Sequence, residues 1–345
     1  MNAPNRLIGF FSVLFLLFFC ACTPQANSFS SARAFSFCMD TWVQQEWHGA
    51  HAQQTCDEIE AALQALEQTV SLYSETSEIA AINAAAGERF VPVGDEVWEI
   101  LQGSVAVCRE SEGRFDITIA PLSLLWDVTG EHPRVPSPQE IAAAQSSVDY
   151  RKLLFDETNR SVMLAERGMS LDLGAAAKGY AAAKMRGIVE KNGVSGFLSI
   201  GGNMLVVGKK QDGSDYRIGL RDPRGDENAY FATLVLDGYT LATTGAYERW
   251  FEVGGVRYHH VLDPFTGYPC EGDLLAVTVM SPDGLLADCL STAIFLEGSA
   301  GLEAAFARED CMVLAVTDTG DVWASPGFWD RLTPVSSSGY RFHRD

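Results

Sequence analysis

Basic residues are few in this chain of 345 residues. Lysine and arginine number 25 against 45 aspartates and glutamates, which gives a formal net charge of −20. Because a surface of that sign repels phosphate backbones, the composition argues against nucleic acid as a partner. A phosphate-bearing ligand would need a metal ion or a focused local site to bind here.

Cysteine is sparse as well, with eight residues, of which Cys20 and Cys22 fall at the start of the chain. The other six are Cys38, Cys56, Cys108, Cys270, Cys289 and Cys311. Their scattered positions lack C-x-x-C spacing, which is unlike a zinc site or a dense disulfide framework. Several lie among apolar neighbours and are expected to be small core residues. One disulfide stays open as an alternative.

No apolar run is long enough to span a bilayer comfortably, since residues 7–21 fall short of the roughly 20 that spanning needs. Behind Arg6, this run resembles an export signal covering residues 1–22. Ala21-Cys22 resembles a bacterial lipobox that makes Cys22 the lipidated residue, although Phe19 replaces the usual leucine. Ordinary secretion with cleavage nearby is the alternative. We expect an exported protein, lipid-anchored to the membrane and facing the periplasm, at the inner membrane in the simplest case.

No internal repeat or linker interrupts residues 36–345, so this range predicts one domain, and residues 23–35 predict a flexible tether before it. Hydrophobic residues make up 47 %, enough for a full core. Residues 50–70 and 95–112 have the spacing of amphipathic helices, whereas residues 35–47 predict one strand. The mixture predicts an α+β fold with antiparallel sheets and flanking helices.

The chain is organised around residues 171–180, which read LDLGAAAKGY. This stretch predicts a strand that turns directly into a helix. The first turn of a helix offers unpaired N–H groups and is a natural seat for phosphate. Asp172 and Lys178 bracket that seat. The alternative is a packing turn, since a glycine-containing turn alone is a weak motif.

Five blocks, in order along the chain, resemble the ApbE family of FAD:protein FMN transferases. The blocks are residues 113–126, 171–181, 199–203, 243–267 and 287–293. They include GRFDIT followed by PL and W, DLGAAAKGYA, GGN, TTGAY followed by HVLDPFTG, and ADCLSTA. The resemblance implies an ApbE-like domain over residues 36–345.

The resemblance also implies an activity, Mg²⁺-dependent transfer of FMN from FAD. FMN would be attached through its phosphate to a Thr or Ser hydroxyl of an exported acceptor protein with a D-[GA]-x-[ST]-like motif, and AMP would leave. One alternative is a periplasmic FAD-binding lipoprotein or an FAD pyrophosphatase, in which water attacks instead. Another is a solute-binding lipoprotein without chemistry.

A metal site is expected at Asp288 and Thr292, which lie four residues apart on one face of a predicted helix. Carboxylate and hydroxyl oxygens suit Mg²⁺ or Ca²⁺ better than zinc, and Mn²⁺ is a further substitute. The family's backbone carbonyl ligand falls on Ala175. The alternative for Asp288 is an ordinary solvated carboxylate.

The remaining site residues are implied by the resemblance. The residues placed against FAD are Met39, Tyr73, Arg114, Phe115, Asp116, Asp172, Lys178 and Leu262. Core packing is the alternative for Met39 and Phe115, and turn capping is the alternative for Asp172. His260 receives the catalytic role, because a histidine can accept a proton near neutral pH. Its neighbour His259 is expected to be structural, since adjacent strand residues face opposite ways.

Overall fold

The computed structural model describes residues 30–226 and 228–344. The predicted export signal, Cys22 and residues 23–29 of the predicted tether lie outside these described residues. Within them, no single helix is long and apolar enough to cross a membrane. One pair of consecutive helical segments, Gly284–Glu297 with Ser299–Phe306, has the length and composition but is bent by 117°.

The chain is built on a nine-stranded sheet in the order β1-β2-β6-β7-β10-β13-β14-β15-β17. Its strands are β1 (Ser31–Cys38), β2 (Thr41–His48), β6 (Ser195–Ile200), β7 (Asn203–Val207), β10 (Thr240–Gly245), β13 (Leu274–Ser281), β14 (Met312–Thr317), β15 (Asp321–Ala324) and β17 (Arg341–His343). Neighbouring strands are antiparallel except for β15 and β17, which are parallel. The α+β class with antiparallel sheets and flanking helices is thus confirmed.

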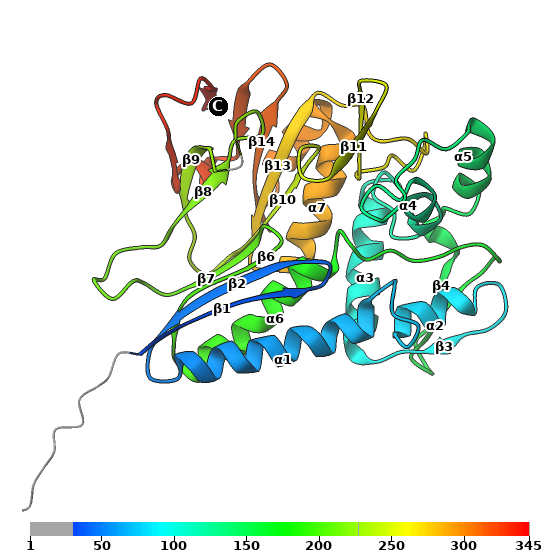
Figure 1. Cartoon of the computed structure of the whole chain (residues 1–345), viewed down its shortest axis with the longest axis horizontal. Helices are drawn as coiled ribbons and strands as arrows, with labels where there is room; N and C mark the ends of the chain where they lie inside the picture. The colour runs from blue at the N-terminus through cyan, green and yellow to red at the C-terminus, as the bar shows by residue number, and fades with distance from the viewer. Residues whose placement is uncertain (1–29, 227, 345) are drawn as a thin grey trace, which may run out of the picture.

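Helices cover one face of this sheet (Figure 1). They are α1 (Ala52–Val70), α6 (Ala177–Asn192) and α7 (Gly284–Glu297), with α3 (Asp95–Glu110) packed on α7. In α1 the residues Ile59, Leu63 and Leu66 are buried at the expected three- and four-residue spacing. These helices and the sheet enclose the main hydrophobic core.

The opposite face of the sheet is covered only in part. A small sheet of β8 (Arg217–Arg221), β9 (Tyr230–Val235) and β16 (Leu332–Pro334) packs there with α9 (Pro326–Trp329). Its core joins Phe231 and Phe328 to the β13–β15 half of the large sheet. At the β1–β2 end this face instead carries exposed aromatic side chains.

Shorter elements complete the domain. They are β3 (Val91–Pro92), β4 (Leu153–Asp156), β5 (Ser161–Leu164), β11 (Trp250–Val253), β12 (Val256–His259), α2 (Glu78–Ala84), α4 (Ala120–Trp126), α5 (Pro138–Gln145), α8 (Leu302–Phe306), and the 3₁₀ turns η1 (Tyr150–Lys152) and η2 (Ser299–Gly301). Ser77 caps α2 by accepting from the N–H of Ala80. Ser137 and Glu140 form a capping box at the start of α5.

The prediction of one strand over residues 35–47 is wrong, because this stretch is a hairpin of β1 and β2. Cys38 pairs with Thr41 across a two-residue loop, and Met39 and Asp40 have φ of 56° and 55°. Such loops usually carry Asn-Gly or Asp-Gly, so the turn has no sequence signal here. The predicted tether also ends too late, since β1 begins at Ser31 and buries Ala32 against α1.

The cysteines in the described residues are all free thiols, so the open disulfide does not form among them. Cys38, Cys56, Cys108, Cys289 and Cys311 are buried, and Cys270 is half-buried. Their expected place in the core is confirmed.

Candidate active site

A cavity of about 880 Å³ lies between the β1–β2 hairpin, the residues before α6, and α7. Its volume is in the range of small-molecule sites. Every predicted site residue within the described residues lines it. These are Met39, Tyr73, Arg114, Phe115, Asp116, Asp172, Ala175, Lys178, His260, Leu262, Asp288 and Thr292. The structure therefore brings together residues that are up to 253 positions apart in the sequence (39 to 292).

The segment before α6 is an extended loop and not the predicted strand. Only Ser170 makes a strand-like bridge, to Ile119. The side chain of Asn83 instead holds Leu171, with its Nδ2 donating to the Leu171 carbonyl at 3.2 Å and its Oδ1 accepting from the Leu171 N–H at 2.7 Å. The N–H of Asp172 also donates to the carbonyl of Ile117 at 2.8 Å, so the segment is held by one side chain and a short backbone contact and not by a full strand pairing.

In the turn at the start of α6, Asp172 and Lys178 each bond to the backbone of Gly174. Oδ1 of Asp172 accepts from the N–H of Gly174 at 2.8 Å, so this carboxylate caps the turn. Nζ of Lys178 donates to the carbonyl of Gly174, and no carboxylate among the described residues pairs with it. A lysine without an anionic partner at the first turn of a helix favours phosphate binding.

Helices α6 and α7 cross very closely beside this turn. A Cβ at Gly179 would clash with the carbonyl oxygen of Gly284 and lie 2.6 Å from Cβ of Asp288. The absence of side chains at both glycines lets the N–H of Gly179 donate to Oδ2 of Asp288 at 2.8 Å. Close helix packing thus fixes the position of this carboxylate.

A chain of hydroxyl groups continues from Asp288 toward β10. The Ser291 hydroxyl donates to the Asp288 carbonyl at 2.9 Å, and Thr244 Oγ1 lies 2.7 Å from Ser291 Oγ and 2.9 Å from Thr292 Oγ1. Thr244 and Ser291 were missed as site residues by sequence reasoning. Their positions inside two of the five sequence blocks were the available signal.

The donors around Asp288 fit a hard divalent cation. Asp288 is only 5 % exposed, yet among the described residues no lysine, arginine or histidine pairs with it. A buried carboxylate without a cation is costly, so a bound metal ion would compensate its charge. The described residues contain no group of three or more His, Cys, Asp and Glu side chains that could hold a metal. Any metal ligands beside Asp288 would therefore have to be hydroxyl or backbone carbonyl oxygens. Asp288, Thr292 and Ala175 line the same cavity, and carboxylate, hydroxyl and carbonyl oxygens are the types of ligand that Mg²⁺ or Ca²⁺ prefers.

His260 follows β12 and is anchored by Arg249. Its backbone N–H donates to the Arg249 carbonyl at 3.1 Å, and its ring Nδ1 lies 3.3 Å from the same oxygen. A proton on Nδ1 would make this second contact a hydrogen bond and leave Nε2 as an acceptor. Burial, reinforced by the positive charge of Arg249, lowers the pKa of His260 from 6.5 to about 3. The ring is therefore a neutral base at physiological pH.

His259 has different surroundings. Its Nε2 lies 2.9 Å from the Cys270 carbonyl, and its ring meets Phe295 edge to face. Arg249 itself bridges to the hairpin turn by donating to the carboxylate of Asp40 at 2.9 Å. Because Arg249 also bonds to His260 through its backbone carbonyl, this ion pair connects His260 to the tip of the β1–β2 hairpin.

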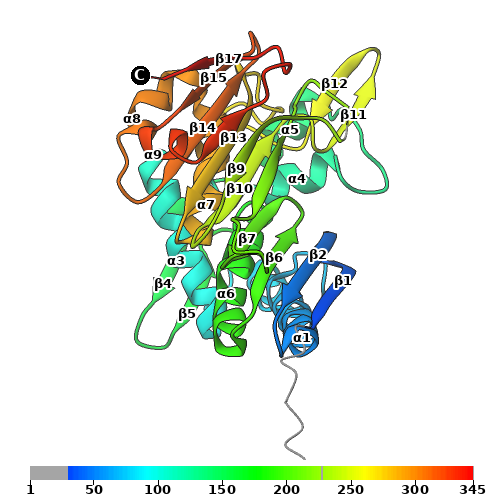
Figure 2. The same ribbon diagram turned by 90° about the vertical axis from the view of Figure 1, so that its left-hand side faces the viewer.

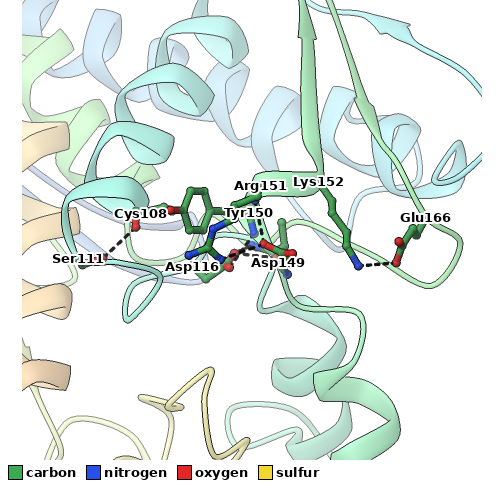
Figure 3. Close-up of polar contacts among 9 residues, drawn as sticks. Cys108, Ser111, Asp116, Asp149, Tyr150, Arg151, Lys152 and Glu166 are labelled. Atoms are coloured by element: carbon green, nitrogen blue, oxygen red, sulfur yellow. Dashed lines mark hydrogen bonds and ion pairs between the residues drawn. The ribbon is translucent and has the colours of Figure 1, made fainter.

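The residues predicted against FAD differ in exposure. Tyr73 is 67 % exposed at the cavity, whereas Phe115 and Leu262 are buried in the core. Both carboxylate oxygens of Asp116 are occupied, Oδ1 by the N–H and hydroxyl of Thr118 and Oδ2 by the N–H of Tyr150. Figure 3 shows Asp116 beside Tyr150 and Asp149. Asp116 lines the cavity, and its carboxylate is engaged in holding Thr118 and the start of η1.

The family model described as the ApbE family matches residues 39–315. A protein of Klebsiella pneumoniae (strain 342) named FAD:protein FMN transferase is 35 % identical over 277 residues, covering 80 % of this chain and 85 % of the relative. A protein of Treponema pallidum (strain Nichols) with the same name is 31 % identical over 293 residues and covers 80 % of each chain.

Solved structures agree with these matches. The crystal structure of the ApbE protein from Thermotoga maritima superposes with a TM-score of 0.81 at 32 % identity, covering 88 % of this chain and 99 % of that one. By sequence and by structure, this chain belongs to the ApbE family.

Proposed function

We propose that this chain transfers FMN from FAD to a Thr or Ser hydroxyl of another exported protein and releases AMP. Its relatives named FAD:protein FMN transferase support the overall activity. The observation that carries the proposal is the presence, in one cavity, of a buried carboxylate without a basic partner, Asp288, and a neutral histidine, His260. The first suits a metal that binds phosphate, and the second suits deprotonation of a hydroxyl.

A divalent cation, Mg²⁺ in the simplest case, would be held by Asp288, Thr292 and the Ala175 carbonyl. When bound, such an ion neutralises negative charge on phosphate oxygens. The protein prepares the position through the Gly179 N–H, which fixes Asp288, and through Thr244, which contacts Thr292. Ca²⁺ and Mn²⁺ offer the same hard-ligand chemistry.

FAD would lie along the cavity with its phosphates near Lys178 and Arg114. No carboxylate among the described residues pairs with either cation, so both are free to meet a pyrophosphate. Tyr73 and Met39 at the hairpin end offer an aromatic face and a thioether to the flavin rings. Leu262, Phe115 and Asp116 shape the wall on which the rings rest.

In the transfer step the acceptor hydroxyl oxygen attacks the phosphorus of the FMN half of FAD. A new P–O bond forms to the acceptor, the P–O bond to the AMP half breaks, and AMP leaves with that oxygen. The proton of the attacking hydroxyl passes to His260. General-base assistance of this kind contributes typically 10²–10⁴-fold to a rate.

Export and lipidation at Cys22 complete the proposal. The apolar segment behind Arg6 and the Ala21-Cys22 pair support a lipid anchor that holds the domain at the periplasmic face of the membrane. The expected partners are thus FAD, an exported acceptor protein and the membrane.

The test is incubation of the purified full-length chain with FAD, Mg²⁺ and a carrier protein bearing a DGATGAT tail, followed by mass spectrometry. The expected result is an FMN-sized mass increment on the tail and release of AMP. Free FMN without modified carrier would instead identify the chain as an FAD hydrolase. Unchanged FAD would identify it as a binding protein.

A further inference from the structure

Strand β1 forms the outer edge of the large sheet (Figure 2). It has eight residues, pairs with β2 alone among the residues that the structure describes, and shows no register shift along that pairing. Edges of this kind are normally protected by proline, a bulge or several charges, because unpaired backbone groups invite another strand. Here Arg33 is the one charged residue of β1, and the strand has no proline.

The pairing register identifies which backbone groups face outward. Cys38 and Thr41 flank a two-residue loop, so they form a hydrogen-bonded pair, and the type of pair then alternates along the hairpin. Two contacts agree with this assignment, since Gly49 N–H donates to the carbonyl of Ser30, and Trp42 directs its carbonyl away from β1 to Gly201. The N–H and C=O groups of Arg33, Phe35 and Phe37 therefore point to the free edge. Within the described residues none of them has a hydrogen-bond partner.

The side chains of the same residues are exposed on the face not covered by helices. Phe35 and Phe37 are 65 % and 60 % exposed, and both rings contact Trp42, which is 59 % exposed, with centroids 4.7 Å and 5.3 Å away. This aromatic cluster is continuous with the cavity, which it lines together with Met39. The edge strand thus leads directly to the place where transfer is proposed.

We infer that the acceptor protein presents its modified segment as an extended strand that pairs with the free edge of β1. This inference rests on the proposed function, which requires a protein segment to reach the cavity. Main-chain hydrogen bonds to Arg33, Phe35 and Phe37 provide affinity that does not depend on the acceptor's side chains, and the aromatic cluster contacts alternate side chains. An added strand running along β1 carries its Thr or Ser toward Met39 and the cavity.

Residue 33 allows a sharp test because its N–H faces outward and it does not line the cavity. Arg33→Ala removes the side chain and its ion pair with Glu46 but keeps the N–H. Arg33→Pro removes the outward N–H as well and spares the ladder to β2. Both are compared as full-length chains in detergent, with the DGATGAT-tailed carrier as acceptor and circular dichroism as a control for folding.

We expect Arg33→Pro to raise KM for the carrier about three- to tenfold above Arg33→Ala, as for the loss of one hydrogen bond. The kcat at saturating carrier and the Kd for FAD should be equal in the two variants. Equal KM values would overturn the inference. Wild type that transfers no FMN would instead contradict the proposed function, so the two failures are distinguishable.

A measurement on the wild type keeps the inference testable if Arg33→Pro does not fold. Saturating carrier should slow hydrogen exchange at the amides of Arg33, Phe35 and Phe37. Unchanged exchange at all three would overturn it. Light scattering provides a second check. A wild-type dimer that Arg33→Pro dissociates without changing KM would also overturn the inference, since a second copy of the chain would then occupy this edge.

Discussion

The backbone N–H of Gly179 donates a hydrogen bond of 2.8 Å to Oδ2 of Asp288, across the point where α6 and α7 cross. One helix therefore positions the carboxylate that the other helix carries. The arrangement depends on two glycines, because neither Gly179 nor Gly284 has space for a Cβ. A change that separates the two helices would therefore also move the carboxylate of the proposed metal site.

Substitution of Gly179 by alanine should disturb both packing and activity. The added methyl group overpacks the crossing and should destabilise the fold by about 1–3 kcal/mol. It should also displace Asp288 and lower the affinity for Mg²⁺. The matched control is Gly187→Ala on the same helix, where no atom beyond the adjacent residues and the local helix backbone lies within 4 Å of the new Cβ. Gly187→Ala should raise the free energy of unfolding by about 0.5–1 kcal/mol, because alanine favours the helix over glycine. Thermal unfolding and Mg²⁺ titration of both variants would check this, and equal behaviour would contradict it.

Asp288→Asn should keep the fold and lose transfer. Asparagine and aspartate have similar helix propensity, so α7 should persist by circular dichroism. Because Mg²⁺ favours charged oxygen ligands, its affinity should fall by at least on the order of 10-fold. Excess Mg²⁺ should recover part of the transfer rate, while FAD binding should weaken less. A folded variant with wild-type activity at low Mg²⁺ would remove Asp288 from the metal site.

His260→Ala should lower kcat by roughly 10²–10⁴-fold with little change in FAD binding, as for loss of a general base. In the wild type the lowered pKa keeps His260 neutral between pH 6.5 and about 3. Its protonation should therefore cause no loss of kcat/KM near pH 6.5. An acid limb centred near pH 6.5 that disappears in His260→Ala would refute this assignment.

The same pKa shift predicts how stability depends on pH. Because the folded state disfavours protonated His260, its contribution to stability is complete above pH 6.5 and declines as the pH falls toward about 3. His260→Ala should flatten this part of the curve of unfolding free energy against pH. Urea unfolding of both proteins across pH 4–7 is the measurement, and parallel curves would argue against the shift.

Cys22→Ser should separate the domain from the membrane. If Cys22 carries the lipid, the variant should appear as soluble exported protein or retain an uncleaved signal. Cell fractionation with mass spectrometry of the N-terminus distinguishes these states. A cleaved variant that stays in the membrane fraction would show that another segment provides the anchor.

Local signals in the sequence were sufficient for the longer helices, whereas most strands had no local signal that fixed their bounds. Ser137 and Glu140 specify the start of α5 within four residues, and the spacing of Ile59, Leu63 and Leu66 specifies the buried face of α1. The error at the β1–β2 hairpin is local, because the two-residue turn at Met39 and Asp40 has no sequence signal. The error at Leu171 has a distant cause, because the side chain of Asn83, 88 positions away, bonds to a segment whose apolar residues alone are typical of a strand.

The candidate site was predictable mainly through the order of its sequence blocks. Those blocks identified residues that line one cavity, but they could not reveal what each side chain bonds. Asp116 uses both oxygens on Thr118 and Tyr150, a fact that depends on the position of η1. Thr244 contacts Thr292 only because β10 lies beside α7. The spacing and composition of residues in the sequence do not predict such contacts between separate elements.

The free cysteines have a consequence for the proposed export of this chain. Burial raises the pKa of the Cys270 and Cys56 thiols to about 11 and that of Cys38 to about 12, and it raises the pKa of Cys108 and Cys289 further. Since the thiolate is the form that reacts with oxidants, these groups stay inert in an oxidising compartment. The domain can therefore mature without oxidative folding catalysts, and reductant should leave its melting temperature unchanged.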